Sequence, residues 1–319
     1  MMPSFFIFMW FLIVSIMMAL SSSSLFFLWI CLEINMMSFI PLMYTKNMIT
    51  MNSIILYFLI QSTASSIFIF MISTFFYNKI ITEYLMTFIT LTMLIKVGAA
   101  PFHIWFPQIS EGLTFNSLSI LLTIQKIIPL YIMSIFKTNM IMISVIMSAF
   151  IGSFGGFNQF SLRKILAFSS ISHLSWILTL LLINSNFWLI YLSIYSLIIF
   201  TMIYIINQIK MNMFNFSKKI NPELNLTLIM MLLTLGGMPP TIGFFMKWMA
   251  LNIIFNQIMM VTIPLIMSSL INTFFYLRLS YPSMLKNIIS YKWEKPYFYK
   301  WIPITFIQIT AIFMMITMI

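Results

Sequence analysis

Apolar residues run along this chain in long stretches that ionisable residues seldom interrupt. A helix needs about 20 mainly apolar residues to cross a lipid bilayer. The stretches without Lys, Arg, Asp or Glu that reach about this length are 1–32, 47–78, 138–162, 165–209, 224–246, 248–277 and 301–319. None of them alternates apolar and polar residues in the sustained way that a transmembrane β-barrel requires. The pattern therefore predicts an all-α membrane protein that crosses the bilayer several times.

Short polar segments divide these stretches into about eleven predicted helices of bilayer-spanning length. Ser, Thr, Asn and Lys gather at the predicted loops 21–24, 45–50, 184–186 and 210–222. The predicted helices are 3–20, 24–43, 51–76, 82–99, 114–136, 139–158, 162–183, 186–209, 223–256 (interrupted), 258–281 and 301–319. The longest polar connection, 282–300, is far shorter than an independently folding domain. We therefore expect residues 1–319 to form a single polytopic transmembrane domain.

Gly and Pro interrupt the apolar pattern at two places, and each place carries a lysine. The first is the segment KVGAAPFHIWFP at 96–107, and the second is LGGMPPTIGFFMKW at 235–248. Proline removes a hydrogen-bond donor, so the freed backbone groups need partners inside the protein or in a hydrated cavity. One such segment could be an ordinary kinked helix with a snorkelling lysine. Two interrupted helices in the two halves of a chain favour a transport site.

Four ionisable side chains lie within the apolar pattern: Glu33, Lys96, Lys126 and Lys247. A charge at the bilayer centre costs about 2.5–3.5 kcal/mol on insertion scales, so such residues usually face the bundle interior or a hydrated path. A buried carboxylate without a partner would take up a proton, and we therefore expect Glu33 to pair with one of the buried lysines. Together the four groups indicate a relay for protons or ions. A purely structural ion pair is the alternative for Glu33.

Lys126 has polar neighbours of its own. It lies about midway along the predicted helix 114–136, where a side chain has difficulty reaching an interface. Ser119 and Thr123 share its face of the helix, and Pro129 leaves the carbonyl of Gln125 without a helical hydrogen bond. These groups predict a hydrated environment that can hold the amine in either protonation state. Snorkelling of the lysine toward the interface is the alternative.

A second polar face lies on the predicted helix 162–183. It contains Ser169, Ser172, His173 and Trp176. Because histidine exchanges protons near neutral pH, His173 is a further candidate for the relay. A structural histidine that is hydrogen-bonded to a neighbouring serine is the simpler alternative. The chain's two histidines cannot supply axial pairs for two haems, and Cys31 alone can form neither an internal disulfide nor a metal site, so we expect no cofactor or metal.

Composition agrees with the membrane class. The chain is 62% hydrophobic and only 7% charged, and its mean hydropathy of +1.06 lies far outside the range of soluble proteins. Its net charge of +11 forms no basic stripe with interleaved aromatic residues, so nucleic acid is not an expected partner. The 32 methionines, with abundant Phe, Ile and Asn, match an AT-rich gene in which AUA is read as Met, as in animal mitochondria.

Charge placement predicts an orientation. With about eleven crossings, Lys79 and Lys137 fall on one side of the membrane. The other side receives ten basic residues, which are Lys46, Arg163, Lys164, Lys210, Lys218, Lys219, Lys286, Lys292, Lys295 and Lys300. Because Lys and Arg mark the inner face, the N-terminus is expected inside and the C-terminus outside.

Several segments of the chain resemble a known family. They are WICLEINMMSFIP at 29–41, KVGAAPFHIWFP at 96–107, SLRKILAFSSISH at 161–173 and GGMPP at 236–240. Together they resemble the subunit 2 family of mitochondrial NADH dehydrogenase, an antiporter-like membrane subunit of respiratory complex I. The resemblance covers about residues 25–280, and the short segment before Glu33 is similar to the animal form, which lacks three helices of the bacterial relatives. The last forty residues match no motif of the family.

The resemblance implies an antiporter-like fold with inverted repeats in the mitochondrial inner membrane, with the N-terminus on the matrix side and the C-terminus on the intermembrane-space side. It places Glu33, Lys96, Lys126 and Lys247 on the family's proton pathway along the bilayer midplane. Proton translocation would be coupled to NADH:ubiquinone oxidoreduction, with NADH, flavin, iron–sulfur clusters and ubiquinone bound by other subunits. The expected partners are other membrane-arm subunits, including antiporter-like ones, and the lipid bilayer. A free-standing cation/proton antiporter and a structural membrane subunit without its own proton path are the alternatives.

Overall fold

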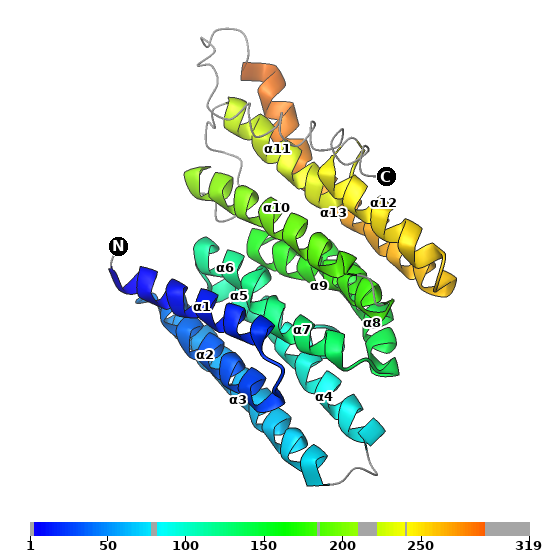
Figure 1. The fold of residues 1–319 in the computed structure, drawn as a ribbon. Helices are drawn as coiled ribbons and strands as arrows, with labels where there is room; N and C mark the ends of the chain where they lie inside the picture. Colours follow the sequence, from blue (N-terminus) through cyan, green and yellow to red (C-terminus); the bar gives the residue numbers. More distant parts are fainter. Residues whose placement is uncertain (1–2, 78–81, 184–185, 210–221, 240, 291–319) are drawn as a thin grey trace.

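The computed structural model describes residues 3–77, 82–183, 186–209, 222–239 and 241–290. Every regular element within these ranges is a helix, which confirms the predicted all-α class. The elements are α1 (Pro3–Ser21), α2 (Leu25–Met43), α3 (Met48–Tyr77), α4 (Thr82–Val97), α5 (Trp105–Gly112), α6 (Phe115–Leu122), the 3-10 helix η2 (Ile124–Lys126), α7 (Ile127–Ile135), α8 (Asn139–Phe157), α9 (Leu162–Leu182), α10 (Phe187–Ile209), α11 (Pro222–Gly236), α12 (Ile242–Phe255) and α13 (Met259–Ser290) (Figure 1). The predicted helix 301–319 lies outside the described residues.

Length and composition make the chain a multi-pass membrane protein. In the described part of the chain, seven helical segments are long and apolar enough to cross a membrane. They are Leu25–Met43, Met48–Thr74, Phe115–Ile135, Asn139–Phe157, Leu162–Leu182, Phe187–Gln208 and Met259–Pro282. Three shorter apolar helical segments accompany them, which are Phe5–Ser21, Leu224–Gly236 and Ile242–Phe255.

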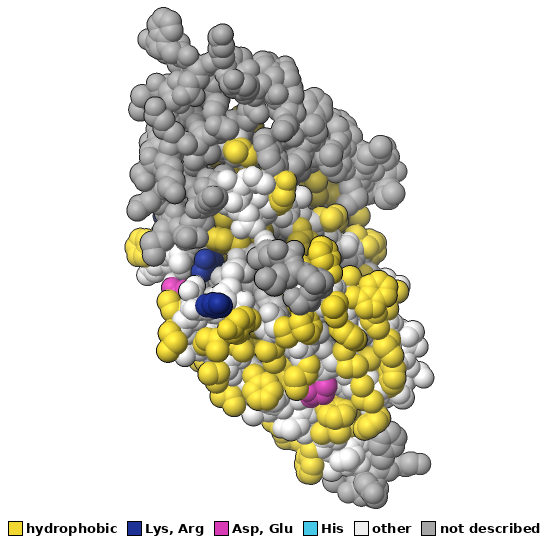
Figure 2. Space-filling view, turned by 90° about the vertical axis from the view of Figure 1, so that its left-hand side faces the viewer, with side chains coloured by type: hydrophobic (Ala, Val, Ile, Leu, Met, Phe, Trp, Pro, Cys, Tyr) yellow, Lys and Arg dark blue, Asp and Glu magenta, His cyan; other side chains and the backbone are white. Residues whose placement is uncertain are grey.

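The helices differ sharply in how much of their surface the protein covers. In α9, 89% of the most apolar window is buried, against 28% in α3, so α9 lies at the centre of the bundle and α3 at its periphery. Figure 1 shows the group α1–α3 on one side and the group α11–α13 on the other. The left-hand side of the molecule in Figure 1 carries a broad apolar surface, which faces the viewer in Figure 2. On α1, Phe6 is 72% and Trp10 67% exposed. Such a surface suits contact with lipid or with apolar partner helices.

Close packing of α8 against α9 fixes the polar face of the central helix. A Cβ on Gly152 of α8 would lie only 2.5 Å from the backbone nitrogen of Ser172, so glycine is what lets the two helices approach. Small residues serve the same purpose at helix contacts in membranes generally. The polar residues of α9 are thereby held inside the bundle, with Ser169, Ser172 and His173 all buried.

α4 and α11 end in the same way. Gly98 and Gly237 follow the two helices with φ of +74° and +82°, a left-handed conformation that glycine adopts without steric cost. After α4, the Ala99 nitrogen donates to the Leu94 carbonyl at 3.1 Å, and after α11 the Met238 nitrogen donates to the Leu233 carbonyl at 3.1 Å. Both are Schellman-type ends. Each is followed by a further helix, α5 and α12.

One sequence-based expectation is corrected near Lys126. The segment 114–136 is not one continuous α-helix: α6 ends at Leu122, and α7 begins at Ile127. Between them the Lys126 nitrogen donates to the Thr123 carbonyl at 3.2 Å, which is a 3-10 turn. Two local causes act here, because Pro129 clashes with the carbonyl four residues earlier and the Thr123 hydroxyl donates to the Ser119 carbonyl at 2.7 Å.

Two further boundaries differ from the prediction. Residues 105–112 fall between the predicted helices 82–99 and 114–136, and they form the short helix α5. The last described helix, α13, continues to Ser290 instead of ending at 281, so part of the predicted connection 282–300 is helical. Both Pro264 and Pro282 lie inside this helix, so proline does not end it as the sequence pattern suggested.

Candidate functional site

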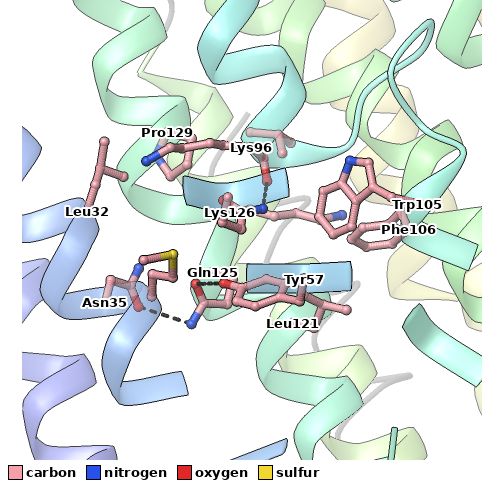
Figure 3. A pocket seen from close by; sticks show the side chains of 13 residues that line it. Leu32, Asn35, Tyr57, Lys96, Trp105, Phe106, Leu121, Gln125, Lys126 and Pro129 are labelled. Atoms are coloured by element: carbon pink, nitrogen blue, oxygen red, sulfur yellow. Dashed lines mark hydrogen bonds between the residues drawn. The ribbon is translucent and has the colours of Figure 1, made fainter. Parts of the chain in front are cut away.

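Lys96 and Lys126 line the same small internal cavity (Figure 3). Only 7% of Lys96 and 2% of Lys126 are exposed. The cavity has a volume of about 20 Å³, which is enough room for about one water molecule. Its other lining residues are Leu32, Asn35, Met36, Tyr57, Gln61, Val97, Trp105, Phe106, Leu121, Gln125 and Pro129. The fold thus brings two of the predicted site lysines together.

Uncharged polar side chains connect the walls of this cavity. The Gln125 amide nitrogen donates to the Asn35 side-chain oxygen at 3.0 Å, and the Tyr57 hydroxyl donates to the Gln125 side-chain oxygen at 3.3 Å (Figure 3). The Gln61 amide nitrogen donates to the Lys96 carbonyl at 3.2 Å. These bonds join α2, α3, α4 and η2 around the two lysines.

Lys126 points from the break between α6 and α7 toward the central helix. Its Nζ donates a long hydrogen bond of 3.5 Å to the Ser170 carbonyl of α9. The same nitrogen lies 5.2 Å from the ring centroid of Phe106 and 5.8 Å from that of Tyr195. Aromatic faces attract a cation at such distances, so the site can hold the ammonium without a carboxylate beside it.

Lys247 closes the break between α11 and α12. Its side chain is 6% exposed, and its Nζ donates to the Gly236 carbonyl at 2.7 Å. Gly236 is the last residue of α11, so its carbonyl lacks a partner within the helix. The lysine therefore supplies the donor that the interruption removes.

His173 of α9 is a further buried member of the candidate site. It is 2% exposed and stays within electrostatic range of both Lys126 and Lys247. Its Nδ1 is 2.9 Å from the Tyr191 hydroxyl, and its ring centroid is 4.8 Å from that of Tyr195. The partner of this ring nitrogen is thus a tyrosine of α10 and not a neighbouring serine.

Glu33 does not form the ion pair that we expected. Its side chain is half-buried, and the one salt bridge among the described residues joins Lys164 to Glu111 at 2.6 Å. Glu33 acts on Lys96 only through space. The reason is helical geometry: Leu32 and Met36 of α2 face the cavity, and Glu33 is turned by about 100° from Leu32.

Trp105 separates the cavity from the outside of the bundle. It is 5% exposed, and its indole nitrogen donates to the Ile95 carbonyl at 3.2 Å. Besides lining the cavity, Trp105 forms part of an outer apolar groove of about 360 Å³. The other residues of the groove are Leu56, Ile60, Ile95, Pro101, Phe102, Ile104 and Gln108.

Sequence reasoning missed the uncharged part of the site. Asn35, Tyr57 and Gln61 were not singled out, and Gln125 was considered only for its backbone carbonyl, although each is a polar residue in a bilayer-length apolar segment. Tyr57 and Gln61 are four residues apart on α3 and so share a helical face. Amide side chains inside apolar helices, read by spacing, are the signal that could have found them.

Metal ligands do not cluster near these lysines. Within the ranges described, no three His, Cys, Asp or Glu side chains gather where they could hold a metal ion. The buried polar groups of the site are instead amines, amides, an imidazole and hydroxyls from several helices. These groups can bind, release and pass protons.

The fold and the buried lysines define an antiporter-like membrane protein. Residues 22–273 match the family described as NADH:quinone oxidoreductase/Mrp antiporter, transmembrane. The structure also resembles a chain of respiratory complex I from Thermus thermophilus, with a TM-score of 0.80 and 19% identity over 87% of this chain and 70% of that chain. A chain of the Mrp complex from Dietzia gives a TM-score of 0.75 at 17% identity, over 84% of this chain and 58% of that chain. At these identities the likeness concerns the fold.

Sequence relatives are more specific. The NADH-ubiquinone oxidoreductase chain 2 of Anopheles gambiae is 42% identical over 301 residues, which cover 90% of this chain and 88% of that protein. The protein of the same name from Rhipicephalus sanguineus is 45% identical over 283 residues, covering 87% of this chain and 89% of that protein. This chain belongs to the NADH-ubiquinone oxidoreductase chain 2 family.

Proposed function

We propose that this chain is a proton-translocating membrane-arm subunit of NADH:ubiquinone oxidoreductase, respiratory complex I. The observation that carries the proposal is the shared cavity of Lys96 and Lys126, a space of about 20 Å³ bounded by amide side chains. A buried amine beside room for water is suited to gaining and losing a proton. We assign the redox groups, which are NADH, flavin, iron–sulfur clusters and ubiquinone, to other subunits of the complex and none of them to this chain.

The proposed relay starts at Glu33. A change of charge in a neighbouring subunit alters the field of Glu33 at Lys96, and the cavity passes this change to Lys126. The proton on Lys126 then moves by way of His173 toward Lys247. The electrostatic range of His173 over both lysines supports this order. Pairwise fields of this kind act strongly in a low-dielectric interior, so small movements suffice.

We assign the finer architecture on the same basis. The chain forms one transmembrane domain with about eleven crossings, two of them interrupted, built on inverted repeats. The matching Schellman-type ends of α4 and α11 support this assignment. The chain lies in the mitochondrial inner membrane beside other complex I membrane subunits, some of them antiporter-like. Its N-terminus faces the matrix and its C-terminus the intermembrane space.

Substitution of Lys126 tests whether the chain relays protons. Lys126→Met keeps the length of the side chain without its titratable group, and Lys126→Arg keeps a charge that does not deprotonate in proteins. Both variants are expected to assemble into complex I and to lose NADH-driven proton uptake in reconstituted vesicles. Lys137→Met and Lys137→Arg are matched controls, because Lys137 lies in the connection between α7 and α8, away from the cavity. Proton uptake at the wild-type ratio in Lys126→Arg would refute the relay and leave a structural role.

A further inference from the structure

A stripe of buried polar side chains runs along α13. It consists of Ser268, Asn272, Tyr276 and Ser280, spaced four residues apart. Their exposed fractions are 0%, 2%, 1% and 0%, in a helix whose outer face carries large apolar residues. Residues at this spacing share one face of a helix. This α13 polar stripe therefore faces the protein interior, where α13 packs against α8, α9 and α11.

The stripe contacts the polar face of the central helix α9. The Asn272 amide nitrogen donates to the Ser172 hydroxyl at 2.7 Å, and Ser172 is the residue before His173. One turn further along, the Tyr276 hydroxyl lies beside Ser169. The α13 polar stripe thus meets α9 at serines that lie within one turn of the relay histidine in sequence.

The stripe also reaches the break that holds Lys247. A Cβ on Gly236 would lie 3.7 Å from the Cβ of Tyr276, which places the tyrosine directly against the end of α11. The carbonyl of this same Gly236 accepts the hydrogen bond from Lys247. Tyr276 is also near Tyr195 of α10, whose ring lies 5.8 Å from the Lys126 nitrogen. The α13 polar stripe therefore lies next to residues that contact or neighbour His173, Lys247 and Lys126.

Polar atoms without a hydrogen-bond partner gather at this junction. The Tyr276 hydroxyl, the Tyr195 hydroxyl and the Asn272 side-chain oxygen are all buried and make no hydrogen bond of normal geometry. Buried polar groups in proteins nearly always have a partner, and ordered water supplies it where side chains do not. Three such atoms in one place indicate positions for water between α9, α10 and α13.

The stripe leads to the end of the bundle where basic residues gather. Two residues beyond Tyr276, Arg278 donates from its Nη2 to the Gln159 carbonyl in the connection between α8 and α9, at 3.3 Å. That connection leads into Arg163 and Lys164 of α9. The eight steps from Asn272 to Ser280 span about 12 Å of helix. The stripe thus extends from the level of His173 toward this basic end.

We propose that the α13 polar stripe, together with Ser169, Ser172 and Tyr195, is a hydrated proton branch that connects the His173–Lys247 part of the relay with the basic end of the bundle. The branch deepens the proposed function and rests on it. Protons move along it by hopping: each hydroxyl or water accepts one proton from one neighbour as it releases another to the next. The Tyr276 hydroxyl takes part in the hopping, whereas the Asn272 amide only orients its neighbours by hydrogen bonds. No group changes its net charge after a full transfer.

The test removes the hydrogen-bonding atoms while keeping side-chain size. Tyr276→Phe deletes only a hydroxyl and keeps the ring, so assembly should be unaffected. We expect NADH-driven proton uptake per assembled complex to fall in Tyr276→Phe. In the double variant Tyr276→Phe/Asn272→Leu, we expect it to fall to the level of Lys126→Met. Tyr281→Phe is the matched control, because Tyr281 is on the same helix but 62% exposed.

The result separates this inference from the function on which it rests. If Lys126→Met lowers proton uptake and the double variant does not, the branch is wrong and the relay stands. If neither Lys126→Met nor the double variant lowers proton uptake, both the proposed function and the branch are wrong. A measurement on the unaltered complex covers the case in which the double variant does not assemble. An experimental map that resolves waters should show water within hydrogen-bond distance of the Tyr276 hydroxyl and the Asn272 side-chain oxygen, and a dry junction would overturn the branch.

Discussion

The Lys247 amine donates a 2.7 Å hydrogen bond to the carbonyl of Gly236, so a lysine of α12 completes the end of the preceding helix α11. Gly237, the next residue, has φ of +82° and no side chain to obstruct this contact. A Cβ at this position would lie 2.9 Å from the Lys247 nitrogen. The conformation of one glycine and the position of one proposed relay lysine are therefore linked.

Gly237→Ala should disturb both the backbone conformation at position 237 and the position of the Lys247 amine. The left-handed conformation costs an L-residue about 1–2 kcal/mol, and the new methyl group would also push the amine away from Gly236. We expect a lower melting temperature of the assembled complex and slower proton uptake. Gly236→Ala is the control, because the nearest atom to its Cβ would be at an ordinary 3.5 Å. Equal melting temperatures for the two variants would contradict the link.

Removal of the Glu33 charge should spare assembly. Because Glu33 has no direct ion-pair partner among the described residues, Glu33→Gln leaves no buried lysine stripped of a contact. We expect wild-type amounts of assembled complex on native gels, together with reduced proton uptake, since the field at Lys96 changes. Glu83→Gln on the exposed first turn of α4 is the matched control. Loss of assembly in Glu33→Gln would mean that Glu33 makes a direct contact in the complete complex.

Gln125 should behave as the centre of the cavity's hydrogen-bond network. Gln125→Leu leaves the Asn35 side-chain oxygen and the Tyr57 hydroxyl without their partner, and an unsatisfied buried group costs about 1–3 kcal/mol. We expect a lower melting temperature of the complex. In the double variant Gln125→Leu/Asn35→Leu, part of the loss should return, because two apolar partners replace an unpaired polar group. Strictly additive effects would show that the two amides do not depend on each other.

Topology can be tested with single cysteines. Glu111 bonds to both Arg163 and Lys164, and Gly112 packs against Ile49 near the start of α3, so Lys46 and Lys164 lie at the same end of the bundle. We expect Lys46→Cys and Lys164→Cys to react with an impermeant maleimide from the matrix side of sealed vesicles, and Thr138→Cys from the opposite side. The native Cys31 is 0% exposed and adds little background. Labelling of positions 46 and 164 from opposite sides would refute the proposed orientation.

The length of the apolar stretches predicts most of the fold, for a physical reason. Lipid leaves few options for a backbone, because each polar group must be satisfied within the helix. The ends of α2, α8, α9 and α10 therefore fall within a few residues of the polar segments that flank them. The break at Lys126 was not predicted, since it needs the joint action of Pro129 and the Thr123 hydroxyl. Each alone is common in an unbroken membrane helix.

The sequence predicts which charged residues of the candidate site are buried, but it does not predict which of them touch. Burial of Lys96, Lys126 and Lys247 follows from the high cost of a charge in lipid, which turns such residues inward. Whether Glu33 touches Lys96 depends on how α2 is rotated about its axis. That rotation is set by packing against α1 and α3, which a helical pattern with nearly uniform hydrophobicity does not encode.

The position of Trp105 has a consequence for the water of the site. Among the residues that line the two spaces, Trp105 alone is shared by the cavity of Lys96 and Lys126 and by the apolar groove on the outside of the bundle. Its indole is held in place by the hydrogen bond to the Ile95 carbonyl. A water-sized space beside two buried amines is therefore sealed from the apolar exterior by one side chain, and a small residue at position 105 would open it to that side.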